Sequence, residues 1–171
     1  MAMGCLLDTS FLITLSGGSR PFHSVARQYF EYCVEGGVPL YLPTPVVMEF
    51  YRKQTLDKLG LHNFLILPLN FDEAVKAAEF AEELQSLAGG AIAERAAVKV
   101  DLALLAQAHL NGIDAILTED EKTLQRFCDI LRERGLLQCH ALLLAEGFDP
   151  GRLADPISPG LVLPEPKDEA D

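Results

Sequence analysis

The sequence predicts an α/β fold, with a mostly parallel central sheet and helices on both of its faces. Short apolar runs alternate along the chain with longer segments whose apolar residues recur at helical spacing. This alternation is typical of chains built from β-α-β units. The 171 residues include 49% hydrophobic and 23% charged residues, a composition that indicates one globular domain with a sizeable core.

The first part of the chain is predicted to form one strand and two helices. The apolar run 5–7 (CLL) predicts a strand, and the segment 8–15 (DTSFLITL) predicts the start of a helix. Within residues 21–37 the apolar side chains recur at helical spacing. Pro21 suits the first turn of this second helix, and a Gly-Gly pair suits its end.

The middle of the chain is predicted to form two strands around a helix. Residues 38–42 (VPLYL) predict a strand, and residues 64–69 (FLILPL) predict either a strand or a loop packed against the core. Thr44-Pro45 is an N-cap and first-turn pair, which predicts a helix that runs to about Lys58.

The last part of the chain is predicted to be mainly helical, with one further strand. Helices are expected at 72–87, at about 96–110 and at 121–134. Residues 115–118 (AILT) predict a strand, and residues 138–147 (QCHALLLAEG) fit a strand or a helix equally well. The sheet would therefore contain at least three strands that end at one common edge.

We expect one domain over residues 1–148, followed by an acidic, proline-rich tail over residues 149–171 that is extended or disordered. The N-terminal apolar run is broken by Asp8, and no uncharged apolar run approaches the ~18 residues that a membrane span needs. A cytoplasmic protein without a membrane segment is therefore expected. The four cysteines show no CxxC spacing, which predicts buried free thiols rather than a zinc site.

Asp101 gives the clearest single signal of a functional site. At helical spacing it shares a face with Leu104, Leu105 and Ala108. A carboxylate on an apolar face costs roughly 2–7 kcal/mol unless something pairs with it. Because no basic residue of the segment 100–110 lies on that face, the partner of Asp101 has to come from elsewhere.

Three further acids are expected near Asp101. Asp8 directly follows the first strand, and Asp120 closely follows the strand 115–118, so both lie beyond the carboxyl ends of strands, where open α/β sheets bind ligands. Glu49 lies one turn into its own predicted helix. Four acids at one edge would repel each other, and a hard cation such as Mg²⁺ or Mn²⁺ would resolve this repulsion.

Each acid also has a structural interpretation that the sequence leaves open. Asp8 could cap the first helix. Thr118 and Glu121 match the S/T-x-x-E spacing of a capping box. Glu49 could be a solvated helix residue, and Asp101 could be a first-turn acid favoured by the helix dipole.

Three segments together resemble the PIN-domain family of nucleases, and most closely the toxin subunits of VapBC-type toxin–antitoxin pairs. These segments are CLLDTSFLI at 5–13, TPVVMEF at 44–50 and VDLALLAQAHLNGIDAILTED at 100–120. The resemblance runs from about Gly4 to Phe127. It implies a Rossmann-like parallel sheet flanked by helices and a Mg²⁺- or Mn²⁺-dependent cleavage of RNA.

The resemblance also assigns roles to residues of this chain. It makes the proposed catalytic and metal-binding acids Asp8, Glu49, Asp101 and Asp120, and it matches Thr118 to the hydroxyl residue that commonly accompanies the last acid. The partners it implies are an RNA substrate, a small antitoxin that places a basic side chain among the carboxylates, and a second copy of the chain in a homodimer.

Charge bears on how RNA would bind. The net charge of −11 argues against binding to nucleic acid without metal. Basic residues close to the acids in sequence are predicted to hold substrate phosphates, although each could equally be part of a solvated helix surface: Arg52, Lys53, Arg95, Lys99 and Lys122.

Two other functions stay open at this point. A phosphatase of the haloacid-dehalogenase type would use Asp8 as its nucleophile, but that chemistry typically needs a second aspartate two positions later, where Ser10 stands. The other alternative is a non-catalytic PIN-like module that serves for binding or scaffolding.

Overall fold

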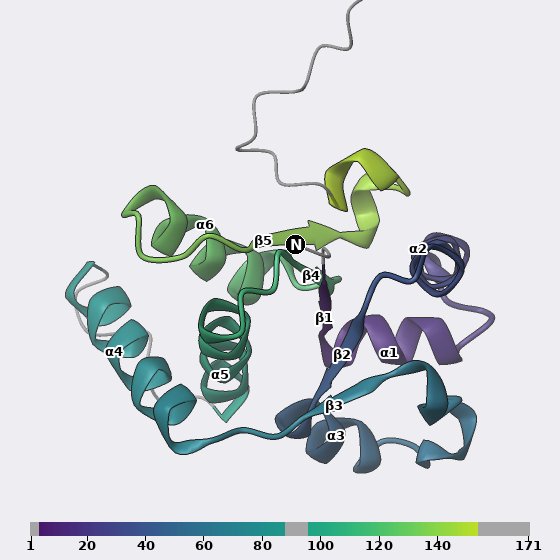
Figure 1. Cartoon of the computed structure of the whole chain (residues 1–171), viewed down its shortest axis with the longest axis horizontal. Helices are drawn as coiled ribbons and strands as arrows, with labels where there is room; N and C mark the ends of the chain where they lie inside the picture. Colours follow the sequence, from purple (N-terminus) through teal and green to yellow (C-terminus); the bar gives the residue numbers. More distant parts are fainter. Residues whose placement is uncertain (1–3, 88–95, 154–171) are drawn as a thin grey trace, which may run out of the picture.

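A five-stranded parallel sheet forms the centre of the molecule, with the strand order β3-β2-β1-β4-β5 (Figure 1). In this computed structural model the described residues are 4–87 and 96–153. The predicted α/β class and parallel sheet are confirmed. The strands are β1 (Cys5–Leu7), β2 (Leu40–Pro43), β3 (Leu65–Leu67), β4 (Ala115–Thr118) and β5 (His140–Leu143).

Helices cover both faces of the sheet. In Figure 1, α1 and α2 lie on one side of the central strands, and α4, α5 and α6 lie on the other. This arrangement follows from right-handed crossovers between parallel strands. From β1 the chain adds β2 and β3 toward one edge of the sheet, and it then returns to add β4 and β5 on the other side of β1. The helices are α1 (Thr9–Ser16), α2 (His23–Gly36), α3 (Thr44–Tyr51), α4 (Phe71–Leu87), α5 (Ala96–Leu110) and α6 (Arg126–Glu133).

The two central strands are apolar at every position up to the point where they end. All residues of β1 and β4 are buried, since helices cover both faces of a parallel sheet. Leu7 pairs with Leu117, and the Asp8 amide donates to the Leu117 carbonyl at 3.1 Å. Asp8 and Thr118 therefore lie next to each other at the carboxyl edge of the sheet.

The helix expected from Thr44 to about Lys58 is shorter than predicted. It ends at Tyr51, and two single 3₁₀ turns follow at Leu56–Lys58 and Leu61–Asn63. Thr44 is not its cap either, because its hydroxyl accepts a hydrogen bond from the Leu69 amide (3.1 Å). The chain has to turn back early in order to place β3 beside β2.

Other boundaries shift by smaller amounts. Helix α2 begins at His23, two residues after Pro21, and ends as predicted, with Gly37 in the left-handed region at φ 67°. The helix expected over 121–134 starts with a π-helical segment at Glu121–Gln125, which leads into α6. The segment 64–69 contains β3, and the ambiguous segment 138–147 contains β5.

The beginning of the predicted tail packs onto the domain. A 3₁₀ turn at Pro150–Leu153 buries Leu153, and His140 Nε2 lies 2.6 Å from the Arg152 carbonyl oxygen. The tail predicted beyond this turn, residues 154–171, lies outside the described residues. All four cysteines are buried free thiols, as predicted. Within 4–87 and 96–153, no helix is both long and apolar enough to cross a membrane.

Candidate functional site

The edge formed by β1 and β4 carries a cluster of hydroxyl groups around Asp8. Thr118 Oγ1 donates to Asp8 Oδ2 at 2.7 Å, and Ser10 Oγ donates to the same oxygen at 2.6 Å. Thr118 Oγ1 also accepts from the Asp120 amide at 2.9 Å. Asp8 occupies the N-cap position of α1, as that interpretation expected, but its side chain makes no capping hydrogen bond to the helix. It is a buried carboxylate fixed by two hydroxyl groups.

Four elements bring their acids to one open cleft of about 400 Å³. Asp8 comes from the end of β1, Glu49 from α3, Asp101 from α5 and Asp120 from the turn after β4. These side chains are far apart in the sequence and line the same space. The remaining residues of the lining are Thr9, Ser10, Ile13, Arg20 and Lys53.

Asp101 is the least satisfied acid of this cleft. It lies in the second turn of α5, whose first turn contains no acid, so the dipole interpretation is wrong. Its side chain is buried, and Oδ2 has no hydrogen-bond partner among the described residues. Burial, followed by the negative charge of Asp8, raises the pKa of Asp101 from its ordinary value of 3.8 to about 7. A hydrogen bond from the Thr123 side chain lowers this pKa in part, and the charges of Asp120 and Glu49 raise it by smaller amounts.

The same balance applies to Asp8. Burial raises its pKa most, and the charge of Asp120 raises it further, whereas the hydrogen bonds from Ser10 and Thr118 lower it. Because the charges of these acids perturb one another, the carboxylates form one electrostatic unit.

Unlike Asp101, neither Glu49 nor Asp120 has a buried side-chain oxygen without a hydrogen-bond partner. Glu49 is half-buried and accepts a hydrogen bond from Thr9 Oγ1 at 2.6 Å, so it is not a solvated helix residue. Asp120 caps the π-helical segment, with Oδ1 accepting from the Thr123 amide at 2.9 Å and Oδ2 accepting from the Thr123 hydroxyl. Asp120 is therefore the cap of this segment, and the capping box of Thr118 with Glu121 is wrong.

A family model described as "PIN domain" matches residues 5–130, a range that includes all four acids. The chain belongs to the PIN-domain family. No curated protein matches the chain. The Rossmann-like architecture expected from the resemblance is the fold of this family.

Solved structures of VapBC proteins have the same fold. VapBC2 from Rickettsia felis, bound to a DNA fragment from its promoter, has a TM-score of 0.56 at 12% identity, covering 82% of this chain and 98% of that one. DNA-bound VapBC from Salmonella typhimurium has a TM-score of 0.52 at 14% identity, covering 83% and 98%. VapC20 from Mycobacterium tuberculosis, a sarcin-ricin-loop-cleaving toxin, has a TM-score of 0.50 at 17% identity, covering 70% and 92%. At these identities the likeness shows the fold alone, and it confirms the predicted VapC-like form of this PIN domain.

The donors of this PIN domain fit a hard divalent cation. Within 4–87 and 96–153, no three acidic, histidine or cysteine side chains lie close enough together to hold a metal ion jointly in this conformation. Mg²⁺ does not need three such ligands, since it keeps several waters and binds through one or two carboxylates. The buried, unpaired Oδ2 of Asp101 is an oxygen donor of the required kind, in a cleft otherwise rich in carboxylate oxygens.

The basic residues predicted to hold phosphates lie in different places. Lys53 lines the acid cleft, and together with Arg52 and Glu49 it also lines a neighbouring pocket. Lys99 instead lines an apolar pocket between α3 and α5, and Lys122 is exposed outside the lining of the cleft. Arg95 lies outside the described residues.

Sequence reasoning missed four residues that hold this site together: Ser10, Arg20, Glu119 and Thr123. Ser10 and Thr123 bind the carboxylates of Asp8 and Asp120, and a hydroxyl two or three positions after an acid is a signal that could have identified both. Arg20 lies in a loop without any such spacing, so only the fold brings it to the cleft.

Proposed function

We propose that this PIN domain is a Mg²⁺- or Mn²⁺-dependent endoribonuclease that hydrolyses phosphodiester bonds of RNA. The observation that carries this proposal is the buried, unpaired Oδ2 of Asp101 in a cleft that three other carboxylates also line. A buried carboxylate with an unpaired oxygen lowers the stability of the folded chain, and a bound cation would offset this loss. The proposed ligands, direct or through water, are Asp8, Glu49, Asp101 and Asp120.

When bound, Mg²⁺ or Mn²⁺ would offset the charge of the reacting phosphate and lower the pKa of the attacking water. The protein's own contribution is to keep its oxygen donors in place before substrate arrives. Thr118 and Ser10 fix the carboxylate of Asp8, and Thr9 fixes that of Glu49. Preorganised groups of this kind need little rearrangement during the reaction.

Lys53 is the predicted phosphate-binding residue that lies best for this role. It lines the acid cleft itself, and Arg52 lines the pocket next to it. We propose that these two residues contact backbone phosphates of the RNA, which gives affinity without sequence preference. Lys99 and Lys122 stay predictions with weaker support, because neither lines the described cleft. Arg95, which lies outside the described residues, stays a prediction.

The same proposal includes a toxin–antitoxin context. The fold likeness to VapBC structures supports an antitoxin partner, and the likeness to the toxin VapC20 supports a toxin role. We further propose that the antitoxin covers the acidic cleft and that the chain forms a homodimer in the cytoplasm. The test is co-purification with the product of a neighbouring short reading frame. Inhibition of cleavage by that product at a one-to-one ratio is the expected result, and full activity in a stable complex would contradict it.

Cleavage of RNA is tested with purified protein, a labelled single-stranded RNA and millimolar Mn²⁺. We expect the natural chain to cleave, Asp8→Asn to lose cleavage, and the exposed neighbour variant Glu121→Gln to keep it. Equal cleavage by the natural chain and Asp8→Asn would mean that a contaminant is responsible. Absence of both cleavage and Mn²⁺ binding would favour the non-catalytic PIN-like module instead.

A further inference from the structure

Arg20 lines the acid cleft although it lies in the loop between α1 and α2, away from every acid of the site in sequence. Together with Lys53 it supplies the basic side chains of the described lining. A surface arginine near acids is usually a solvated ion pair of little consequence. The contacts of Arg20 differ from that case, because several of them hold one particular position of its guanidinium group.

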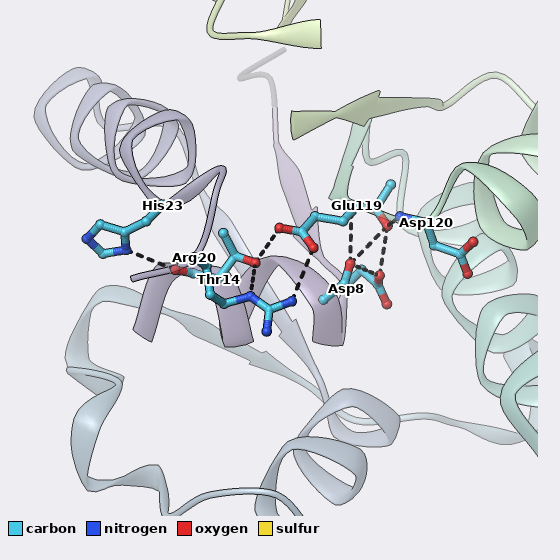
Figure 2. Close-up of polar contacts among 8 residues, drawn as sticks. Asp8, Thr14, Arg20, His23, Glu119 and Asp120 are labelled. Atoms are coloured by element: carbon cyan, nitrogen blue, oxygen red, sulfur yellow. Dashed lines mark hydrogen bonds and ion pairs between the residues drawn. The ribbon is translucent and has the colours of Figure 1, made fainter. Parts of the chain in front are cut away.

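A buried threonine anchors the guanidinium group (Figure 2). Arg20 Nε donates to Thr14 Oγ1 at 3.0 Å, and the Thr14 hydroxyl in turn donates to Glu119 Oε1. Arg20 Nη2 completes the triangle with Glu119 Oε2 at 3.5 Å. Thr14 is fully buried, so this contact belongs to the packed part of the molecule.

Hydrogen bonds also fix the backbone of the loop that carries Arg20. His23 Nδ1 donates to the Thr14 carbonyl at 2.9 Å, and the Arg20 amide donates to the Gly17 carbonyl at 3.0 Å. The stem of Arg20 passes close to Gly17, where an added Cβ would lie 3.0 Å from Arg20 Cδ and 3.1 Å from the Ile13 carbonyl oxygen. Any side chain at position 17 would therefore displace the arginine stem.

Glu119 binds Thr14 and Arg20 and does not take part in the acid cluster. It stands between Thr118 and Asp120, yet both of its oxygens point to Thr14 and Arg20 rather than to the acids (Figure 2). Arg20 uses two of its five N–H groups in these contacts, and its side chain is 43% exposed. The other N–H groups make no hydrogen bond with residues in 4–87 or 96–153, and they are free to meet an anion at the cleft.

We propose that Arg20 is a phosphate-binding residue that positions the RNA backbone beside the acids, and that Glu119 and Thr14 hold it in place for this task. The inference rests on the proposed ribonuclease function and names a further cation, beside Lys53 and Arg52, for its substrate. A guanidinium group suits the task because it donates two parallel hydrogen bonds to one phosphate. Its fixed position reduces the entropy that binding would otherwise cost.

The test measures binding of a labelled ten-nucleotide single-stranded RNA in Mg²⁺, in an Asp101→Asn background so that no RNA is consumed. Arg20→Ala is expected to raise the Kd about tenfold. The slope of log Kd against log salt concentration should fall by about 0.7, the value for one lost phosphate contact on a single strand. Arg20→Lys should keep the slope and recover part of the affinity, because lysine retains the charge without the planar fork.

Two further variants separate positioning from charge. Gly17→Ala keeps the arginine and displaces its stem, so it is expected to raise the Kd about threefold with the slope unchanged. Arg27→Ala is the matched control, since Arg27 is an exposed arginine on α2 paired with Glu31 and outside the cleft lining. It should change neither the Kd nor the slope.

The outcomes distinguish this inference from the proposed function. If the natural chain cleaves RNA while Arg20→Ala leaves Kd and slope unchanged, the role of Arg20 is overturned and the ribonuclease stands. If the natural chain binds RNA through Arg20 but never cleaves it, the phosphate contact stands and the proposed function fails. A lower melting temperature in Arg20→Ala, with an unchanged salt slope, would reduce Arg20 to a structural residue.

Discussion

Two buried carboxylates in this molecule, Glu73 and Asp101, are in opposite situations. Glu73 is 1% exposed, and both of its oxygens have partners: Oε2 accepts from the Asn70 amide at 3.0 Å, and Oε1 accepts from Asn111 Nδ2 at 2.7 Å. Its own amide donates to Asn70 Oδ1 at 2.9 Å, which completes a reciprocal cap at the start of α4. Glu73 is an acid that serves the fold.

Asp101 is nearly as buried, at 7% exposed, yet its Oδ2 has no partner among the described residues, and three other acids share its cleft. Burial alone therefore does not separate a structural acid from a functional one. The difference lies in the neighbours, since amide donors stabilise the charge of Glu73 and other carboxylates oppose the charge of Asp101. Variants at the two positions should accordingly affect different properties of the protein.

The largest expected effect is a contrast between the two variants: Asp101→Asn should lower activity, and Glu73→Gln should lower stability. Asp101→Asn should lower RNA cleavage at least about 100-fold, because it removes an electrostatic group from the reaction site. Glu73→Gln should leave the rate close to that of the natural chain and lower the free energy of unfolding by about 1–3 kcal/mol, because the amide opposes the donors around it. Cleavage assays and urea denaturation of both variants are the measurements.

Either of two results would remove this contrast. If Glu73→Gln abolished cleavage while remaining folded, the cluster at the start of α4 would belong to the functional site. If Asp101→Asn cleaved at the natural rate, the unpaired oxygen would have no role in the reaction.

The next effect is a pH dependence of stability in the absence of metal. Between its ordinary value of 3.8 and the raised value of about 7, the folded chain keeps a proton on Asp101 that the unfolded chain has lost. The free energy of unfolding therefore decreases as the pH rises through this window. From pH 5 to pH 8 we expect a loss of about 2–3 kcal/mol in EDTA, measured by urea denaturation. The pKa of Asp8 is also raised, mainly by burial, so its titration changes the stability in the same direction.

Asp101→Asn should flatten this pH profile and be more stable than the natural chain at pH 8. Parallel profiles for the natural chain and Asp101→Asn would show that Asp101 does not carry the strain that its surroundings imply.

The smallest expected effect is stabilisation by the cation itself. Mn²⁺ at 10- to 100-fold excess over its Kd should raise the free energy of unfolding by about 1.4–2.7 kcal/mol at pH 8. The gain should shrink as the pH falls below about 7, because a proton then competes for Asp101. Thermal melts with and without Mn²⁺ measure it, and Glu73→Gln should respond like the natural chain. A full response in Asp101→Asn would place the cation elsewhere.

Much of the fold was predictable because its strands are short, fully buried and therefore continuously apolar. CLL and AILT were predicted as strands and form β1 and β4. The glycine at position 37 ends α2 through its left-handed conformation, a role that sequence alone reveals. The acids could be named in advance because they follow strands or interrupt an apolar helix face, as Asp8 and Asp101 do.

The rest depended on contacts between distant segments. Thr44 was expected to cap α3, but its hydroxyl binds the amide of Leu69 in the connection after β3. Thr118 matched the spacing of a capping box as one interpretation, but its hydroxyl binds Asp8, which lies beside it once β1 pairs with β4. Local patterns describe the hydrogen bonds that a segment makes with itself, and these hydroxyls found partners outside their segment.

By itself, the sequence determined the alternation of strands and helices, the parallel sheet and the identity of four acids, because apolar periodicity and chain order are local properties. Only the tertiary structure decided which hydroxyl holds which carboxylate, that Asp101 keeps an unpaired oxygen, and that Arg20 reaches the cleft through Thr14 and Glu119. The physical reason is that the free energy of a charged group depends on every neighbour within a few ångströms. Most of those neighbours come from other parts of the chain.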